Sequence, residues 1–229
     1  MQLFYLENPQ SEIILSAEES KHSIKVLRKK EGDILNFTDG KGMFYKAKII
    51  LADSRKCTLE VVSREQKSKN HDYYLHIAIA PTKNIERFEW FLEKATEIGI
   101  DEITPIICFR SQRKTIKNER ASRILLSAIK QSLKYHLPKL NETTSLKNFL
   151  KQDLLGKKYI AHCENSKKYD LKSENKFEKV TILIGPEGDF SIEEIELAKA
   201  QKFKEISLGE SRLRTETAGI ISAYTINIK

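Results

Sequence analysis

The chain has 229 residues, of which 40% are hydrophobic and 31% are charged, a balance that is typical of a globular protein with its own buried core. With 9 glycines and 5 prolines it is neither collagen-like nor of low complexity, and its three cysteines show neither a CxxC motif nor the spacing of a zinc site. Residues 1–9 lack the basic and apolar regions of a signal peptide, and no long apolar window follows them. We therefore expect a soluble, cytoplasmic protein that binds no metal.

A first group of short β-strands lies between residues 13 and 62. The turn Asp39-Gly40-Lys41-Gly42 separates two of them, and a helical stretch at residues 16–27 opens with Ser16 and Glu19 at the spacing of a helix cap. Strands are expected at residues 34–38, 43–50 and 57–62. A run without any apolar residue, 63–72, ends this region. The sequence predicts a small β-barrel domain over residues 1–68 and a second domain over residues 73–229.

From residue 73 onward, strands alternate with helices. Apolar residues recur every three or four positions in the helices, as Phe88, Leu92 and Ala95 do, and Ser191 with Glu194 forms a capping-box pattern. The expected strands cover residues 75–80, 103–107, 158–163, 180–184 and 206–208, and the expected helices cover residues 84–98, 191–201, 215–228 and a segment around 121–129. This alternation predicts an α/β domain with a mostly parallel, doubly wound sheet.

One segment carries the chain's excess of positive charge. Forty lysines and arginines against 32 aspartates and glutamates give a formal charge of +8, and residues 110–140 contain nine of these basic residues with one acidic residue, Glu119. Such a concentration of charge suits contact with a polyanion such as RNA. A solvated basic helix face has the same pattern, so the charge alone leaves both interpretations open.

Three loops that follow predicted strands are rich in glycine or charged residues. They are residues 163–165, 185–189 and 208–217. Ligands of open α/β sheets bind at the carboxyl ends of the strands, and glycines there let the backbone approach a ligand closely. The run Gly185-Pro186-Glu187-Gly188 also forms an ordinary β-turn in many proteins. The last loop is harder to explain as a simple connection, because four charged side chains crowd between a strand and an apolar helix.

Two of these loops resemble the signature loops of a known family. Ile-Gly-Pro-Glu-Gly-Asp-Phe-Ser at 184–191 and Leu-Gly-Glu-Ser-Arg-Leu-Arg-Thr-Glu-Thr-Ala at 208–218 are similar to those of the RsmE family, the 16S rRNA uridine-N3 methyltransferases of the SPOUT superfamily. The resemblance covers nearly the whole chain and includes Lys83, Arg87, residues 93–99, Pro105, residues 110–111, residues 131–132, Pro138, His22, residues 26–28, residues 32–33 and residues 39–40. Two positions depart from the family pattern: Asp189 stands where a second glycine is frequent, and Lys134 where arginine is usual.

The resemblance implies a fold and a reaction that periodicity does not. A SPOUT domain threads its C-terminal segment into a trefoil knot, whereas the alternation of elements alone predicts an unknotted sheet. The N-terminal domain of the family is a PUA-like β-barrel that helps to hold RNA. The family binds S-adenosylmethionine (SAM) in the knot loops and acts as a homodimer on 16S rRNA. We expect the same cofactor, RNA substrate and assembly for this chain, with no membrane partner.

The chemistry of this reaction suggests roles for individual residues. Arg214 and Glu216 are the expected catalytic residues, since loss of the uridine N3 proton calls for an acceptor and for a cation near the carbonyl oxygens. Glu216 also suits the first turn of the last helix as a purely structural acid. The expected cofactor-binding residues are Glu164, Leu183, Gly185, Pro186, Glu187, Gly188, Leu208, Gly209, Leu213, Thr217 and Ala218. The expected RNA-binding residues are Arg28, Arg87, Arg110, Ser111, Arg113, Lys114, Gln131 and Lys134.

The RNA-binding assignment predicts separate effects on RNA and cofactor. Arg110 and Arg113 lie in the basic segment, so we expect their loss to weaken RNA binding and leave cofactor affinity unchanged. A non-enzymatic protein that docks on the ribosome is the alternative function, and SAM binding distinguishes the two. A nucleotide hydrolase is excluded because the sequence has no GxxxxGK[ST] loop.

Overall fold

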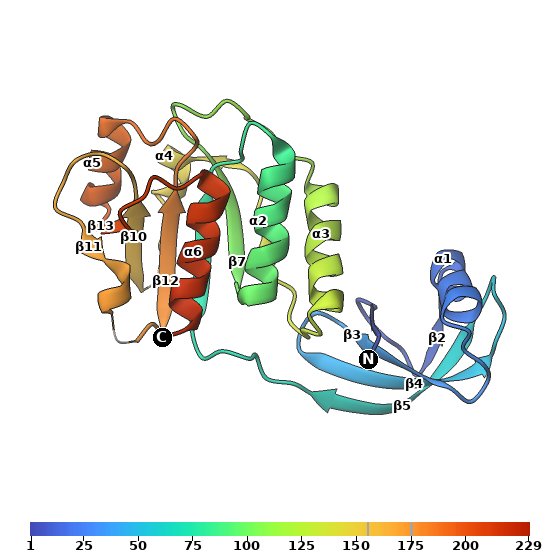
Figure 1. The fold of residues 1–229 in the computed structure, drawn as a ribbon. Helices are drawn as coiled ribbons and strands as arrows, with labels where there is room; N and C mark the ends of the chain where they lie inside the picture. The colour runs from blue at the N-terminus through green and yellow to red at the C-terminus, as the bar shows by residue number, and fades with distance from the viewer. Residues whose placement is uncertain (155, 175) are drawn as a thin grey trace. The chain divides into compact units, whose positions relative to one another are not determined.

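The computed structural model describes residues 1–154, 156–174 and 176–229, which divide into two compact units (Figure 1). The first unit contains residues 1–69 and 129–137, and the second contains residues 70–128 and 138–229. Helix α3 (Asn118–Gln131) therefore begins in the second unit and ends in the first. Each unit has its own sheet and its own buried apolar core.

The first unit is built on a curled sheet of five strands. They are β1 (Leu3–Tyr5), β2 (Glu12–Ile14), β3 (Ile34–Thr38), β4 (Met43–Leu51) and β5 (Thr58–Gln66), in the spatial order β1-β3-β4-β5-β2. β1 runs parallel to β3, and the other neighbours are antiparallel. Phe4, Phe37 and Leu59 belong to its buried core. The three strands expected between residues 34 and 62 are confirmed, and the expected barrel takes the form of a curled sheet with β1 and β2 at its edges.

The helical stretch of the first unit begins at its predicted cap. The Ser16 Oγ accepts a hydrogen bond from the Glu19 N–H at 3.2 Å, and α1 (Ala17–Lys21) follows. The chain then continues as a π-helix, η1 (His22–Val26), which the sequence pattern does not predict. Arg28, just beyond it, has a φ of 54°. This left-handed residue therefore lies in the turn that leads to β3.

Residues 129–137 belong to the first unit although they are distant from it in sequence. The Gly42 N–H donates to the Tyr135 carbonyl at 2.9 Å, and the Leu137 N–H donates to the Gly40 carbonyl at 2.8 Å. Gly42 has a φ of 102°, and a Cβ there would lie 2.6 Å from the His136 ring. The positive φ favours glycine at this position, and any other residue would also have to displace the His136 side chain.

The second unit contains an eight-stranded sheet in which every described pairing is parallel. Its strands are β6 (Tyr74–Ile79), β7 (Glu102–Ile107), β8 (Lys139–Leu140), β9 (Thr144–Ser145), β10 (Lys157–Ala161), β11 (Tyr169–Asp170), β12 (Lys179–Ile184) and β13 (Lys204–Ser207). The order is β11-β13-β10-β12-β6-β7-β8, with β9 also paired to β7. The predicted parallel α/β sheet is confirmed.

Helices cover both faces of this sheet. On one face, α2 (Ile85–Ile98) and α6 (Thr215–Asn227) pack side by side, and α6 lies against β6 and β12 (Figure 1). The other face is covered by α4 (Leu146–Phe149) and α5 (Ile192–Ala200), whose apolar side chains share a core with Ala78, Ala80 and Leu183. A short 3-10 helix, η2 (Leu171–Ser173), follows β11. Central strands with two covered faces are mostly apolar, and β6 and β12 have five consecutive buried residues each, of which only His76 and Thr181 are polar.

Cap chemistry places the ends of two helices where the sequence predicts them. Asn84 accepts from the Glu86 N–H at the start of α2, and Ser191 and Glu194 form a reciprocal capping box at the start of α5. The predicted strand at residues 158–163 is too long, because β10 ends at Ala161. His162 and Cys163 therefore belong to the loop beyond it. None of the helices in the described ranges has both the length and the apolarity needed to cross a membrane.

Candidate active site

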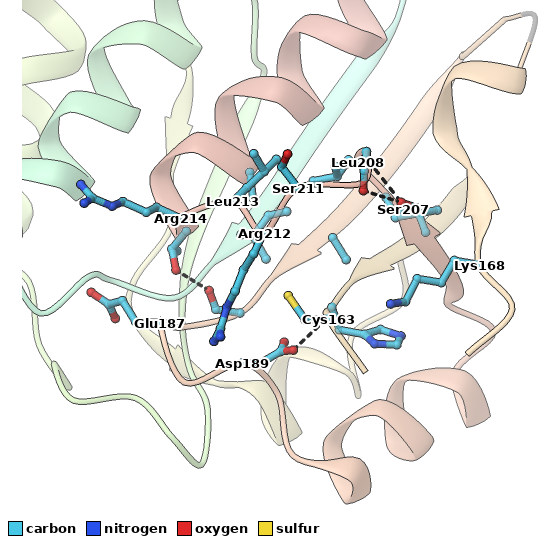
Figure 2. A pocket seen from close by; sticks show the side chains of 18 of the residues that line it. Cys163, Lys168, Glu187, Asp189, Ser207, Leu208, Ser211, Arg212, Leu213 and Arg214 are labelled. Atoms are coloured by element: carbon cyan, nitrogen blue, oxygen red, sulfur yellow. Dashed lines mark hydrogen bonds between the residues drawn. The ribbon is translucent and has the colours of Figure 1, made fainter. Parts of the chain in front are cut away.

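A cavity of about 560 Å³ opens at the carboxyl ends of β10, β12 and β13 (Figure 2). This volume is in the range of pockets that bind small molecules or cofactors. The loops that follow these three strands, together with the start of α6, form its walls. The lining residues are Ala161, His162, Cys163, Lys168, Ile184, Gly185, Pro186, Glu187, Asp189, Ile206, Ser207, Leu208, Gly209, Glu210, Ser211, Arg212, Leu213, Arg214, Thr215 and Ala218.

The loop after β12 is a tight turn tied to α6. The Asp189 N–H donates to the Pro186 carbonyl at 2.9 Å and closes the turn. The Thr215 hydroxyl, on the first residue of α6, donates to the Gly185 carbonyl at 3.0 Å. A Cβ on Gly185 would lie 3.0 Å from the Phe190 ring. The turn therefore needs a small residue at its start and is fixed against the last helix.

The Asp189 side chain joins two walls of the cavity. Its Oδ2 accepts from the Cys163 N–H at 2.7 Å, and its Oδ1 accepts from the Phe190 N–H at 2.8 Å. Asp189 itself has a φ of 64°, a conformation that aspartate tolerates better than most residues. The departure from the family's usual glycine thus adds a link between the loops after β10 and β12.

Two arginines of the basic segment hold main-chain groups of the site. Arg110 Nη1 donates to the carbonyls of Gly188 at 2.9 Å and Phe190 at 3.3 Å. Arg113 donates to the carbonyls of Thr82 at 3.0 Å and Lys83 at 2.8 Å, in the loop after β6. These contacts are a role that the charge pattern did not predict. They make both side chains part of the framework of the site, and their expected contact with RNA stays a prediction.

The loop after β10 contains a buried histidine. The His162 side chain is buried, and its Nε2 lies 3.0 Å from Glu205 Oε1. Burial lowers the pKa of His162, so its ring is neutral at physiological pH. Lys168 Nζ donates to the Glu164 carbonyl at 2.6 Å and closes the loop. Burial also raises the pKa of the Cys163 thiol, which keeps it protonated.

The loop after β13 carries the charged side chains at the mouth of the cavity. Gly209 has a φ of 132°, and the Ser207 hydroxyl donates to its carbonyl at 3.0 Å. In Figure 2, Arg214 and Glu187 lie at one end of the cavity and Lys168 lies at the other. Arg212 extends between them toward Asp189 (Figure 2). The two ends of the cavity therefore differ in the side chains they offer to a ligand.

The structure brings most, but not all, of the expected cofactor-binding residues to the cavity. Those that line it are Gly185, Pro186, Glu187, Leu208, Gly209, Leu213 and Ala218, whereas Glu164, Leu183, Gly188 and Thr217 do not. Leu183 is fully buried in the core beneath the loops. Cys163, Asp189 and Arg212 also line the cavity; they lie in the loops that the sequence singles out, although no cofactor role is predicted for them. Sequence reasoning missed His162, Lys168 and Ser207. His162 directly follows β10 and Ser207 is the last residue of β13, so the carboxyl ends of the strands were the available signal for these two.

The two expected catalytic residues lie in different surroundings. Arg214 lines the cavity and is exposed. Glu216 does not line it, and its side chain is only 7% exposed, with Oε1 3.9 Å from Arg87 Nε. Among the residues that the structure describes, no hydrogen-bond partner reaches its Oε2. Glu216 is therefore a buried carboxylate behind Arg87.

The expected RNA-binding residues are spread over both units. Arg28, Gln131 and Lys134 belong to the first unit, and the others belong to the second. Lys114 is exposed, whereas Ser111 is buried and accepts from the Cys108 N–H at 2.9 Å. Within residues 1–154, 156–174 and 176–229, no group of three or more histidine, cysteine or acidic side chains is placed to hold a metal ion.

Family models match both parts of the chain. Residues 69–227 match the RNA methyltransferase domain, and residues 15–62 match the RNA methyltransferase PUA domain. Among curated relatives, the ribosomal RNA small subunit methyltransferase E of Rickettsia conorii is 30% identical over 223 residues, which cover 95% of this chain and 90% of that protein. The protein of the same name from Mesomycoplasma hyopneumoniae is 28% identical, with 96% of each chain covered.

Solved structures agree with these matches. A structure described as a probable rRNA-methyltransferase from Porphyromonas gingivalis superimposes with a TM-score of 0.93 at 39% identity, covering 100% of this chain and 99% of that one. A protein from Legionella pneumophila, described as a methyltransferase and solved with bound SAM, has a TM-score of 0.87 at 28% identity, with 99% and 96% of the two chains covered.

Proposed function

The chain belongs to the RNA methyltransferase family, and from this premise we propose that it transfers a methyl group from SAM to N3 of a uridine in 16S rRNA. The cavity at the carboxyl ends of β10, β12 and β13 is the observation that carries the proposal, because it combines a cofactor-sized volume with the loops that resemble the RsmE signatures. The names of the relatives support small-subunit rRNA as the substrate.

The residues that line the cavity fit SAM. Ile184, Ile206 and Leu213 offer apolar surface for the adenine ring, and carboxylates offer partners for the positive sulfonium and ammonium groups. Lys168 and Arg212 suit the cofactor's carboxylate. The residues proposed to hold the cofactor are Gly185, Pro186, Glu187, Leu208, Gly209, Leu213 and Ala218. When bound, SAM supplies a methyl group on a positively charged sulfur.

The task of the protein is to hold the acceptor nitrogen in line with that methyl group. The N3–H of uridine must also be lost, with negative charge spreading to the flanking carbonyl oxygens. Arg214 lies at the same end of the cavity as Glu187, and we assign it to the stabilisation of this charge. Glu216 is buried outside the cavity, so in this proposal it does not contact the acceptor base.

The two domains divide the work in this proposal. Residues 1–68 form the PUA-like domain that helps to hold RNA, and residues 73–229 form the methyltransferase domain. The matches of residues 15–62 to a PUA model and of residues 69–227 to an RNA methyltransferase model support this division, and in the fold residues 129–137 join the first domain. An rRNA substrate supports a cytoplasmic location for the enzyme.

We also propose the trefoil knot and the homodimer that the RsmE resemblance implies. The parallel sheet with β12 between β10 and β6 supports the SPOUT topology. The neighbouring helices α2 and α6 expose Trp90 by 46% and Tyr224 by 52%, which suits an interface. Sedimentation of an active monomer at working concentration would overturn the dimer.

A methyl-transfer assay tests the proposed function. The protein is incubated with SAM carrying a tritiated methyl group and with purified small-subunit or large-subunit rRNA, free or in subunits. We expect label in the small-subunit rRNA. Calorimetry with SAM is the companion measurement, because a non-enzymatic RNA-binding protein has no reason to bind the cofactor. RNA binding without SAM binding or label transfer would favour that alternative.

A further inference from the structure

A second hollow, of about 480 Å³, lies beside the cofactor cavity. It is lined by Lys83, Asn84, Arg87, Gln112 and Glu187. Glu187 also lines the first cavity, so the two spaces share one carboxylate side chain. No residue of the hollow is assigned to the acceptor base by the sequence pattern, which suggests only phosphate contact for Arg87.

The order of the strands explains why the two spaces adjoin. The cofactor cavity lies over the ends of β13, β10 and β12, and the next strands in the sheet are β6 and β7. Lys83, Asn84 and Arg87 follow β6, and Gln112 follows β7. Glu187 comes from the loop after β12, and its Oε1 accepts from the Lys83 N–H at 2.8 Å. This hydrogen bond fixes the carboxylate between the two spaces.

The hollow presents hydrogen-bonding groups that the protein does not use itself. The Asn84 Oδ1 caps α2, which leaves its Nδ2 as a donor. Among the residues that the structure describes, none forms a hydrogen bond or an ion pair with the side chain of Lys83 or Gln112. All the residues that line the hollow are polar or charged. Amides and cations of this kind match the two carbonyl oxygens and the N–H of a uracil edge.

A buried carboxylate stands behind the arginine of the hollow. The Glu216 side chain is 7% exposed and its Oε1 lies 3.9 Å from Arg87 Nε, whereas Arg87 is 40% exposed. An unpaired buried carboxylate is costly, so a cation on its open side stabilises it. Glu216 is thereby placed to orient Arg87, and its burial leaves no room for it to meet the N3–H of a base.

We propose that this hollow is the acceptor-base pocket, that it takes an N3-unsubstituted uracil, and that Glu187 accepts the N3 proton. The inference rests on the proposed function and deepens it. Arg87 is assigned to the uracil edge as a charge stabiliser, with Glu216 as its positioning residue. The side-chain amides of Asn84 and Gln112 donate hydrogen bonds to the carbonyl oxygens of the uracil.

The proton and the electron pairs are accounted for in this assignment. The N3–H bond breaks, the proton goes to a carboxylate oxygen of Glu187, and its electron pair stays on the uracil, shared between N3 and the two carbonyl oxygens. That pair then forms the bond from N3 to the methyl carbon, while the pair of the breaking carbon–sulfur bond stays on sulfur, which becomes a neutral thioether.

The charged groups around Glu187 suit this role. Lys83 in the loop after β6 and Arg87 in α2 line the same hollow as Glu187, and Arg214 lies at the same end of the cavity as Glu187. Arg212 and Asp189 lie farther along the same cavity (Figure 2). The cations stabilise the negative charge that the uracil carries once N3 has lost its proton.

Variants of the two carboxylates, Glu187 and Glu216, test which of them accepts the N3 proton. Glu187→Gln keeps an oxygen to accept the Lys83 N–H, and Glu216→Gln keeps the shape of the buried side chain. Single-turnover methyl transfer is measured for both at saturating SAM and RNA between pH 6 and 8, with SAM affinity measured by calorimetry. We expect Glu187→Gln to lose roughly a hundredfold or more in rate, and its remaining rate to rise about tenfold per pH unit because hydroxide must then remove the proton. Glu216→Gln should be slower but keep the wild-type pH profile.

A cofactor-free measurement locates the pocket directly. 4-Thiouridine 5′-monophosphate retains the N3–H and crosslinks to neighbouring residues under ultraviolet light, and mass spectrometry of the digested protein identifies the attachment. We expect crosslinks at residues 83–87 or 112, reduced in Asn84→Asp, which keeps the Oδ1 cap but loses the Nδ2 donor. Crosslinks found only elsewhere would overturn the pocket.

The outcomes separate this inference from the proposed function. If the wild-type protein transfers no methyl group to small-subunit rRNA, the proposed function fails. If the wild-type protein is active and Glu187→Gln keeps the wild-type rate and pH profile, the function stands and the assignment of Glu187 is overturned. The same conclusion follows if only Glu216→Gln changes the pH profile of the methyl-transfer rate.

Discussion

Replacing Arg110 tests whether the basic segment also shapes the cofactor site. Arg110 Nη1 donates to the Gly188 and Phe190 carbonyls, at 2.9 Å and 3.3 Å, and so holds both sides of the turn that lines the cavity. A hydrogen bond from a charged donor contributes about 1.5–3 kcal/mol when it is well shielded. Arg110 is exposed and one contact is long, so we take about 1.4 kcal/mol for the pair, which corresponds to a tenfold change in the equilibrium constant between the ordered and the disordered turn.

The sequence predicts that loss of Arg110 leaves cofactor affinity unchanged, but these contacts lead us to expect that Arg110→Ala weakens SAM binding by up to about tenfold, measured by isothermal titration calorimetry. Lys114→Ala is the matched control, because Lys114 is exposed in the same segment and its loss changes the charge by the same amount. Arg110→Lys should fall between Arg110→Ala and the wild-type protein, since an ammonium lacks the planar fork of arginine. Equal SAM affinities for Arg110→Ala and Lys114→Ala would refute the reasoning.

Three further predictions concern glycine geometry and pH. Gly209→Val should abolish SAM binding in a folded protein, because its φ of 132° suits glycine and a branched side chain would distort the loop; unchanged affinity by calorimetry would contradict this. Gly219→Ala should lower the free energy of unfolding by about 1–3 kcal/mol in urea titrations, because a Cβ there would lie 2.6 Å from the Phe91 ring. A more stable variant would contradict this and show that α2, which carries Phe91, moves aside at little cost. Burial lowers the pKa of His76 from 6.5 to about 4, so the unfolded chain binds the proton more readily and stability falls as the pH drops from 6.5 toward 4. Between pH 7.5 and 5 this loss should be about 2 kcal/mol in urea titrations and should shrink in His76→Gln; an equal loss in both proteins would exclude His76 as its source.

Local chemistry explains which parts of the fold the sequence could predict. The caps at Asn84 and Ser191 depend on neighbours within three residues, and the strands of the α/β domain are apolar runs bounded by turns. The assignment of residues 129–137 to the first unit depends instead on hydrogen bonds to Gly40 and Gly42, about ninety positions away. No local pattern records such a contact.

The same distinction applies to the site. Glycines and charged residues after strands mark the loops of the cavity, because ligand sites in α/β sheets form at those ends. The partners of individual side chains are not visible in the sequence. Arg110 is predicted as a phosphate contact from its charge, yet its guanidinium reaches the Gly188 carbonyl, 78 positions along the chain. Glu216 is predicted from its loop, and only the packing of α6 shows that it is buried.

Nucleoside mass spectrometry of small-subunit rRNA tests the central claim most directly. The rRNA is compared between cells that carry the gene, cells that lack it, and cells that lack it but express the protein from a plasmid. The account predicts that 3-methyluridine disappears from 16S rRNA when the gene is absent and returns with the plasmid. An unchanged amount of 3-methyluridine in 16S rRNA, or the loss of a different methylated nucleoside, would contradict it.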